Sequence, residues 1–381
     1  MAEKYGLPYY IYKSDILYNQ VKELQGCFED FTLLYSVKAN PYKEVLACVA
    51  KCDIGIDAAS IKEVLLAKEQ GIGSDQIYYS APGKTYQDLQ EGIDYSHIIA
   101  DSLNELFLLN ELCSKKGTVK DVGVRINLTS LPLEDDLKER MSRPSSKFGI
   151  DLAYFEQNLS DILALNYIHV TILHVYVGSQ IFSANVLNSN IKIISAVALE
   201  LIGKGVDLRE VNYGGGFGFP CSGKVLPLDL CLLKKILKEN VELKRVKEKN
   251  VKCIIESGRF LIAGAGEFVT DIVDIKKSGG EKYYILQGIM NQFFRPVFMN
   301  ESHDIVVLSA SSEVETVHIC GNLCTPLDEI SSNEEVPKAQ KGDLVIVKNA
   351  GAYGKTMSLN HFISHTEAIE LLVNPDFTVI K

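Results

Sequence analysis

The first residue in this sequence with clear reactive potential is a lysine at the end of an apolar run. In "LLYSVKAN", residues 33–40, a strand-like stretch apolar enough to be buried on both faces ends at Lys38. Lysines at strand ends often hold their amines in water, and they can equally serve as nucleophiles in a ligand site. The side chains that the rest of the chain brings to the same place decide between these two roles.

Seven more apolar runs end in small or polar residues, and the groups at their carboxyl ends could act together on a ligand. Carboxylates there can hold or move protons, and arginines offer fixed positive charge to anions. The residues are Asp57, Asp101, Arg125, Tyr176, Gly214, Gly215, Gly216, Glu256 and Arg259. The "GGGFG" run leaves backbone N–H groups open to a phosphate, but glycine clusters also form plain structural turns. Both uses of the glycines stay open.

The order of these runs predicts how they are positioned. Between residues 30 and 260 the eight runs alternate with helix-like stretches such as "NELFLLNELCSKKG", whose apolar residues recur at helical spacing. Ser102 with Glu105 three residues later indicates a capping box at the start of that helix. Eight strand–helix units predict a (β/α)8 barrel, whose active site lies at the carboxyl ends of the strands. An open doubly wound sheet is the alternative architecture.

After about residue 262 the alternation of strand-like and helix-like stretches ends, and β-forming segments follow one another. Segments such as "EFVTDIVDIKKSGGEKYYILQG" and "DLVIVKNAG" are rich in β-forming residues and are separated by Gly, Asp, Asn and Ser. We therefore expect an α/β barrel over residues 27–262 and a mostly antiparallel β domain over residues 263–381. The early strand-like piece "PYYIYKS" is expected to join the β domain, which would then include residues 1–26.

Net charge, the length of apolar runs and cysteine spacing limit the kinds of molecule that this protein is expected to bind. The 381 residues carry a net charge of -10, which disfavours nucleic acid and anionic membranes because both require a positive surface. We expect no signal peptide and no membrane span, since no uninterrupted apolar run reaches the ~18 residues that a span requires. The nine cysteines lack the paired spacing of zinc sites, so we expect reduced thiols, no metal and a cytoplasmic location.

A lysine, a phosphate cradle and a carboxylate in one barrel mouth indicate pyridoxal 5'-phosphate (PLP). Lys38 would hold the cofactor's aldehyde as a Schiff base, and the glycines with Arg259 would hold its phosphate. Glu256 would keep the pyridine nitrogen protonated, which makes the ring an electron sink.

The motifs also resemble a known family over nearly the whole chain. "YSVKAN", "GIDAAS", "SKFGI", "GGGFG", "ESGR", "GNLCTPLD" and "AGAYG" are similar to motifs of the barrel-type (fold type III) PLP-dependent decarboxylases, the diaminopimelate and ornithine decarboxylases and their relatives. This resemblance implies a PLP-binding barrel plus a β domain, and a head-to-tail homodimer with active sites shared at the interface.

The resemblance assigns a role to individual residues. The cofactor-binding residues that it implies are Lys38, Asp57, Arg125, Tyr176, Ser179, Gly215, Gly216, Glu256, Gly258, Arg259 and Tyr353. Cys324, contributed by the partner subunit, matches the cysteine that protonates the product carbanion. The expected substrate-binding residues are Arg295, Cys324, Thr325 and Asp328.

Three departures from the family pattern concern ring stacking and the substrate. Tyr176 stands where the second histidine of "HxHxGS" stacks on the cofactor, and His174 occupies the earlier position, where we expect a satisfied core histidine. Thr325 and Pro326 follow Cys324, where diaminopimelate decarboxylases carry a glutamate. Gln287 and Asn291 occupy the segment in which ornithine decarboxylases carry an aspartate for the distal amine.

We therefore expect a PLP-dependent α-decarboxylase of the side branch that acts on modified amino acids in secondary metabolism. Its substrate would be a siderophore-type intermediate or an aminoacyl group tethered to a carrier protein. The alternatives are a diaminopimelate decarboxylase of lysine biosynthesis, an alanine-racemase-like enzyme, and a non-catalytic homologue. Glu256 opposes the racemase, because racemases place an arginine at the pyridine nitrogen.

Overall fold

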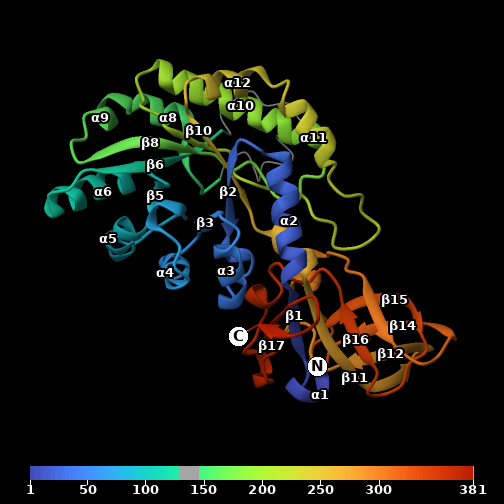
Figure 1. Cartoon of the computed structure of the whole chain (residues 1–381). Helices are drawn as coiled ribbons and strands as arrows, with labels where there is room; N and C mark the ends of the chain where they lie inside the picture. The colour runs from blue at the N-terminus through green and yellow to red at the C-terminus, as the bar shows by residue number, and fades with distance from the viewer. Residues whose placement is uncertain (129–145, 381) are drawn as a thin grey trace.

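The computed structural model describes residues 1–128 and 146–380, which form a barrel and a separate β domain (Figure 1). Figure 1 shows helices around the barrel and, at one end of the molecule, the β domain that contains both termini. The predicted fold class, an α/β barrel followed by a mostly antiparallel β domain, is confirmed.

Within the described residues, eight parallel strands close into the barrel in the order β5-β4-β3-β2-β10-β9-β8-β6, with β6 pairing back onto β5. All eight coincide with the apolar runs of the sequence. They are β2 (Phe31–Ser36), β3 (Gly55–Ala58), β4 (Ile77–Ser80), β5 (His97–Ala100), β6 (Lys120–Asn127), β8 (Ile168–His174), β9 (Glu210–Asn212) and β10 (Lys252–Ser257). The open sheet is therefore excluded, because β5–β6 pairing removes both edges.

Burial on both faces explains why these strands lack the alternating pattern of a half-exposed sheet. Every residue of β3 and β4 is buried, and so are the last four of β2. Inside the barrel the side chains of Leu34, Tyr78, Ile99, Ile172 and Ile254 form a cluster of their own. This packed interior leaves room for a ligand only beyond the strand ends.

Helices cover the outside of the barrel. They are α3 (Lys43–Ala50), α4 (Ile61–Glu69), α5 (Tyr86–Tyr95), α6 (Leu103–Lys116), α8 (Leu152–Gln157), α9 (Leu159–Leu163), α10 (Ala184–Gly203), α11 (Leu230–Leu237) and α12 (Val241–Glu248). Helix α6 begins as predicted, with Ser102 Oγ accepting the Glu105 N–H at 3.1 Å. The second half of the predicted capping box differs: Glu105 accepts the Asp101 N–H and pairs with Lys84.

The β domain is a mixed sheet with mostly antiparallel pairings. Its main path runs β15-β14-β12-β11-β1-β17-β18, and β16 joins β13 to β11. The strands are β1 (Tyr9–Lys13), β11 (Gly266–Ser278), β12 (Glu281–Leu286), β13 (Ile305–Leu308), β14 (Val314–Cys320), β15 (Glu329–Pro337), β16 (Leu344–Val347), β17 (Ile369–Val373) and β18 (Val379–Ile380). Two pairings, β1 with β17 and β12 with β14, are parallel.

The N-terminal strand β1 lies in the β domain, between β11 and β17, as expected for "PYYIYKS" (Figure 1). Helix α2 (Ser14–Cys27) then leads from β1 into the barrel strand β2. The precise boundary between the domains, set at residues 27 and 262 from the sequence, stays a prediction.

Two hydrogen bonds tie the β domain to the loop that carries Lys38. The Tyr353 N–H donates to the Ala39 carbonyl at 2.7 Å, and Asn40 Nδ2 donates to the Gly351 carbonyl at 3.0 Å. Ala39 and Asn40 are both buried. The "AGAYG" segment therefore lies directly against the carboxyl end of β2.

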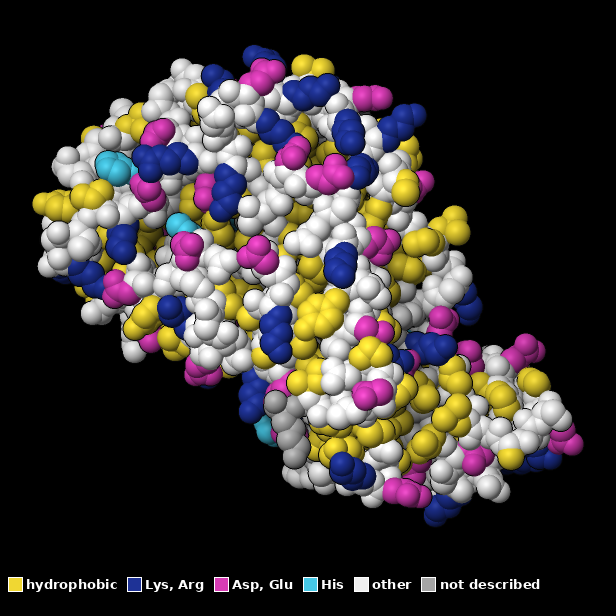
Figure 2. All heavy atoms as spheres, in the orientation of Figure 1, with side chains coloured by type: hydrophobic (Ala, Val, Ile, Leu, Met, Phe, Trp, Pro, Cys, Tyr) yellow, Lys and Arg dark blue, Asp and Glu magenta, His cyan; other side chains and the backbone are white. Residues whose placement is uncertain are grey.

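The surface shown in Figure 2 carries acidic and basic side chains interspersed among apolar ones. Helix α10 is long and apolar enough to span a membrane by length and composition. In this structure it covers the barrel beside α11 and α12, and its residues Leu187, Ile191, Ile194 and Leu201 are buried.

Candidate active site

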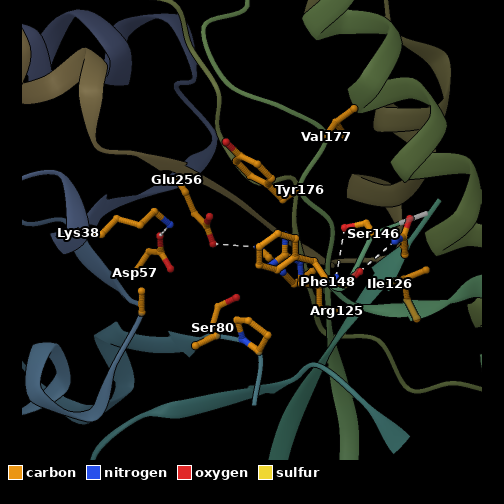
Figure 3. A pocket seen from close by; sticks show the side chains of 15 residues that line it. Lys38, Asp57, Ser80, Arg125, Ile126, Ser146, Phe148, Tyr176, Val177 and Glu256 are labelled. Atoms are coloured by element: carbon orange, nitrogen blue, oxygen red, sulfur yellow. Dashed lines mark hydrogen bonds and ion pairs between the residues drawn. The ribbon is translucent and has the colours of Figure 1, made fainter. Parts of the chain in front are cut away.

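A cavity of about 320 Å³ opens at the carboxyl ends of the barrel strands (Figure 3). Its walls come from the carboxyl ends of β3, β4, β6, β8 and β10 and from segments that follow β2, β3, β4, β6 and β8. Among its lining residues are Lys38, Asp57, Ser80, Arg125, Phe148, His174, Tyr176 and Glu256. The cavity lies where the barrel fold predicts an active site.

Lys38 lies on the short helix η1 (Val37–Ala39) that directly follows β2. Its side chain is 43% exposed toward the open cavity, and its Nζ lies 3.0 Å from Oδ2 of the buried Asp57. Burial works against the charged amine, but the carboxylates of Asp57 and Glu256 outweigh it and raise the pKa of Lys38. Burial and the neighbouring Glu256 in turn raise the pKa of Asp57.

Glu256 is buried at the end of β10 and is held by two side chains. Asn212 Nδ2 donates to its Oε1 at 2.6 Å, and His174 Nε2 lies 3.2 Å from the same oxygen. Burial opposes ionisation of this carboxyl, yet His174, Lys38 and Asn212 together lower its pKa to about 2. Glu256 is therefore a fixed negative charge beside the cavity.

Arg125 lies between two aromatic rings on the other side of the cavity. Its guanidinium carbon is 4.7 Å from the centre of the Phe148 ring and 5.7 Å from that of Tyr176. Asp101 lies 3.9 Å from its Nη1. These contacts fix the Arg125 side chain, and Tyr176 remains 38% exposed at the mouth.

Three glycines allow the loops beyond the cavity to approach so closely that a side chain would not fit. A Cβ on Gly215 would lie 2.1 Å from the Glu256 carbonyl oxygen, and one on Gly216, whose φ is +91°, would lie 2.2 Å from the Gly178 carbonyl oxygen. A Cβ on Gly258 would lie 2.8 Å from that of Ala39. The loops after β8, β9 and β10 thus converge into a cradle lined mainly by backbone and small residues.

A second, smaller cavity occupies this cradle. Ser179, Gly215, Gly216, Gly258, Arg259 and Tyr353 line it, together with Lys38, Tyr176 and Glu256. Arg259 is buried, and its Nε has no hydrogen-bond partner among the described residues. An unpaired guanidinium donor beside bare glycine backbone is suited to a phosphate. All eleven predicted cofactor-binding residues line one of these two cavities, and their donors and charges fit PLP.

The predicted substrate-binding residue Arg295 lies outside both cavities, at the start of α14 (Arg295–Met299). It is buried, and its Nε donates to Glu301 Oε2 at 2.7 Å. Tyr353 lies between two arginines, with its ring centre 4.8 Å from the Arg259 guanidinium carbon and 5.2 Å from that of Arg295.

Glu301 also belongs to a cluster that offers three metal-ligating atoms, together with Cys221 and His303. The two arginines argue against a cation there, because Arg295 already pairs with the Glu301 carboxylate and Arg259 lies 3.8 Å from it. The cluster is better described as a network that balances two buried positive charges.

Cys324, Thr325 and Asp328 lie on the turn between β14 and β15 and do not line either cavity of their own chain in its described part. Cys324 is exposed. Asp328 is buried instead, and its carboxylate accepts the backbone N–H groups of Met290 at 2.7 Å and Leu323 at 2.9 Å. Asp328 therefore fixes the turn that presents Cys324.

Sequence reasoning missed three residues of the site. The sequence pattern favours a core role for His174, although it stands two positions before Tyr176. Asn212 was passed over in favour of the glycines that follow it, although it too ends a barrel strand. Glu301 has no signal in the sequence, because its partners lie on segments whose contact depends on the tertiary fold.

Comparison with known proteins agrees with this geometry. Residues 14–263 match the family described as "Pyridoxal-dependent decarboxylase, pyridoxal binding domain". A diaminopimelate decarboxylase of Aquifex aeolicus is 29% identical over 98% of this chain and 88% of its own length. An L-glutamyl-[BtrI acyl-carrier protein] decarboxylase of Niallia circulans is also 29% identical, over 98% of this chain and 90% of its own.

A solved structure of the diaminopimelate decarboxylase of M. jannaschii, in complex with L-lysine, has a TM-score of 0.92 to this chain at 25% identity. The alignment covers 100% of this chain and 90% of that one. The family match covers most of the chain, and the cavity residues fit the cofactor. The chain belongs to the pyridoxal-dependent decarboxylases, and it is a PLP-dependent amino-acid decarboxylase.

Proposed function

We propose that this enzyme removes the α-carboxyl group of an amino-acid derivative whose distal end is neutral, acylated or tethered to a carrier protein. The observation that carries this proposal is the pairing of Arg295 with Glu301 at 2.7 Å. A free distal carboxylate would have to displace Glu301 before it could use this arginine. In addition, Thr325 and Pro326 follow Cys324 and supply no carboxylate for a distal amine.

The cofactor would be held by groups on five loops. Lys38 would hold the aldehyde carbon, and Ser179, Gly215, Gly216, Gly258, Arg259 and Tyr353 would bind the phosphate. Asp57 would keep Lys38 oriented, since it contacts Nζ at 3.0 Å. When bound, PLP supplies an electron sink next to the substrate's Cα, which makes the loss of CO2 feasible.

The remaining residues would control charge and protons. Glu256 would hold a proton on the pyridine nitrogen, and Tyr176 would cover one face of the ring, with Arg125 fixed against it. Cys324 would return a proton to Cα after CO2 has left. Because Cys324 does not line the cavity of its own chain, this role requires the Cys324 of a second copy.

We therefore propose a homodimer with shared active sites. The turn that carries Cys324 also exposes Leu327, at 64%, and α14 exposes Phe298, at 61%. We propose that the dimer covers these two apolar side chains. A cytoplasmic location remains a prediction from the sequence.

Diaminopimelate is the second candidate substrate, and the comparisons favour it. The relatives from Aquifex aeolicus and M. jannaschii both bear the name diaminopimelate decarboxylase. One carrier-dependent relative, from Niallia circulans, is also 29% identical to this chain, and it supports the first candidate.

Steady-state CO2 release from the purified holoenzyme tests the proposal. Diaminopimelate, lysine and ornithine should each have a kcat/KM at least about 100-fold below that of the true substrate, because an unpaired charge in a buried pocket costs a few kcal/mol. Side-chain-acylated diamino acids and an aminoacyl carrier-protein thioester form the comparison set. A kcat/KM of about 10⁴ M⁻¹s⁻¹ with diaminopimelate would overturn the proposal in favour of the second candidate.

A further inference from the structure

A buried histidine contacts the carboxylate that faces the cofactor ring position. His174 is 2% exposed, ends β8, and has its Nε2 3.2 Å from Glu256 Oε1. Neither Nδ1 nor Nε2 makes a hydrogen bond to the described residues, so the 3.2 Å approach to Glu256 is a close charge contact. Glu256 Oε1 lies 3.2 Å from Nε2, so a proton carried on that nitrogen would lie beside the carboxylate.

The neighbouring strands fix this contact. In the barrel His174 is in register with Arg125 on β6 and with Asn212 on β9. Asn212 bonds Glu256 Oε1 at 2.6 Å, and its own Oδ1 accepts the Gly214 N–H at 2.9 Å. The carboxylate thus accepts one side-chain hydrogen bond, from Asn212 on β9, and has the His174 imidazole of the adjacent strand β8 beside it. The same asparagine links this pair to the glycine loop.

The charged groups around the pair have opposite signs. Arg125 neighbours His174 on β6, and Lys38 and Asp57 approach Glu256 from the loop after β2 and from β3. Burial and the neighbouring Glu256 carboxylate raise the pKa of Asp57. For Glu256 itself, His174, Lys38 and Asn212 outweigh burial and lower the pKa.

We propose that His174 is a positioning residue that keeps Glu256 ionised and oriented, so that the shared proton stays on the pyridine nitrogen of PLP and not on Glu256. This inference rests on the proposed role of Glu256. It assigns a function to a histidine that could otherwise be a plain core residue.

The Glu256 carboxylate and the pyridine nitrogen of PLP compete for one proton. A carboxylate that accepts N–H donors is a weaker base, so it leaves the proton on the ring nitrogen. Without the imidazole, Glu256 would keep the Asn212 hydrogen bond and the nearby Lys38, but it would lose the contact with His174 and become more basic. A change of about one pK unit in Glu256 shifts the sharing of the proton about tenfold.

The positions of Tyr176 and His174 support separate roles for them, one covering the cofactor ring and the other acting on Glu256. Tyr176 is 38% exposed and cannot carry a positive charge, whereas His174 is buried beside the carboxylate. The imidazole is therefore placed where it can act on Glu256, and the ring face is left to an aromatic side chain.

The test reads the ring nitrogen directly, by ¹⁵N NMR of holoenzyme loaded with PLP labelled at that nitrogen. His174→Phe removes the donor and should move the signal toward that of unprotonated PLP and lower kcat about tenfold or more. His174→Gln keeps an N–H donor and should give an intermediate signal. His169→Gln, at an exposed position of the same strand, is the matched control and should change nothing.

The outcomes separate this inference from the proposed role of Glu256. Glu256→Gln should give the signal of an unprotonated ring, and a wild-type signal there would refute the proposed role itself. If Glu256→Gln shifts the signal but neither folded His174 variant does, the inference about His174 is wrong. Should His174→Phe fail to fold, His174→Gln and His174→Asn carry the test, with thermal melting as the check of folding.

Discussion

Two lysines at the mouth of the barrel show how surroundings decide what one residue type can do. Lys84 is buried, and its Nζ donates to the carbonyls of Ala81 and Ile99, both at 2.7 Å, and to Glu105 at 2.8 Å. All three of its protons are used, so it stabilises the loop after β4. Lys38 has Asp57 as its acceptor and opens into the cavity.

Substitution of Lys38 by alanine should abolish the covalently bound chromophore, because the cofactor aldehyde would lose its amine. Borohydride reduction of the wild type followed by peptide mapping should place the PLP adduct on Lys38. Lys62→Ala, at an exposed position of α4, serves as the control and should retain the chromophore. An adduct on Lys84 in the wild type would contradict the assignment.

Residues that end barrel strands were predictable, whereas residues that act through a partner were not. Lys38, Asp57 and Glu256 each close an apolar run, and the barrel topology brings such ends together. The contact of Glu301 with Arg259 and Arg295 joins three segments without a shared motif. The substrate-binding role of Asp328 also remains a prediction, since its carboxylate is occupied by two backbone N–H groups.

At the scale of elements, one helix start carries a titratable group close to the site. Helix α4 follows β3, the strand that bears Asp57, and Ser60 Oγ accepts the Glu63 N–H at 3.3 Å. The Glu63 carboxylate in return accepts the Ala59 N–H at 2.6 Å. Burial outweighs this hydrogen bond and raises the pKa of Glu63 to about 7.

This shift predicts a pH dependence of stability. The folded chain holds the Glu63 proton up to pH about 7, and the unfolded chain releases it near 4.5, so the free energy of unfolding should fall as the pH rises through this window. Glu63→Gln keeps an acceptor for Ala59 and should flatten that slope. Urea unfolding between pH 4.5 and 8 measures it, with Glu69→Gln as control; equal slopes in Glu63→Gln and wild type would contradict the prediction.

The elements themselves differ in how far the sequence predicts them. Each barrel strand is a short apolar run, and its neighbours follow from the order of the chain, so type and position could both be predicted. The parallel pairings of β1 with β17 and of β12 with β14 join segments that are not consecutive. Such pairings depend on register and packing in the finished domain, which composition does not reveal.

At the scale of the whole molecule, the β domain completes the site in two different ways. Within one chain, Tyr353 reaches the cradle and its N–H binds the Ala39 carbonyl at 2.7 Å, next to Lys38. Tyr353 has a φ of +61°, a conformation that costs energy for a residue with a side chain. Between chains, the exposed turn with Cys324 would supply a proton donor to the cavity of the partner.

Shared sites predict that two inactive variants restore activity when their subunits mix. Lys38→Ala removes the amine from one chain, and Cys324→Ala removes the proton donor from the other. In a hybrid dimer one site receives both defects, and the other combines an intact Lys38 with the partner's intact Cys324. That second site should turn over at the wild-type rate, which makes the recovered activity proportional to the fraction of hybrid dimers.

Subunit exchange is followed with two different affinity tags, and CO2 release is measured on the doubly purified hybrid. A Lys62→Ala and Cys231→Ala pair, both at exposed positions, controls for the effect of exchange on activity. If Cys324 acts within its own chain, the hybrid has no intact site, because each chain then carries one defect. Suppose that hybrids form in the expected proportion but release no CO2. Cys324 and Lys38 of one chain would then belong to the same site, and the turn with Cys324 would have to fold back onto the barrel of its own chain.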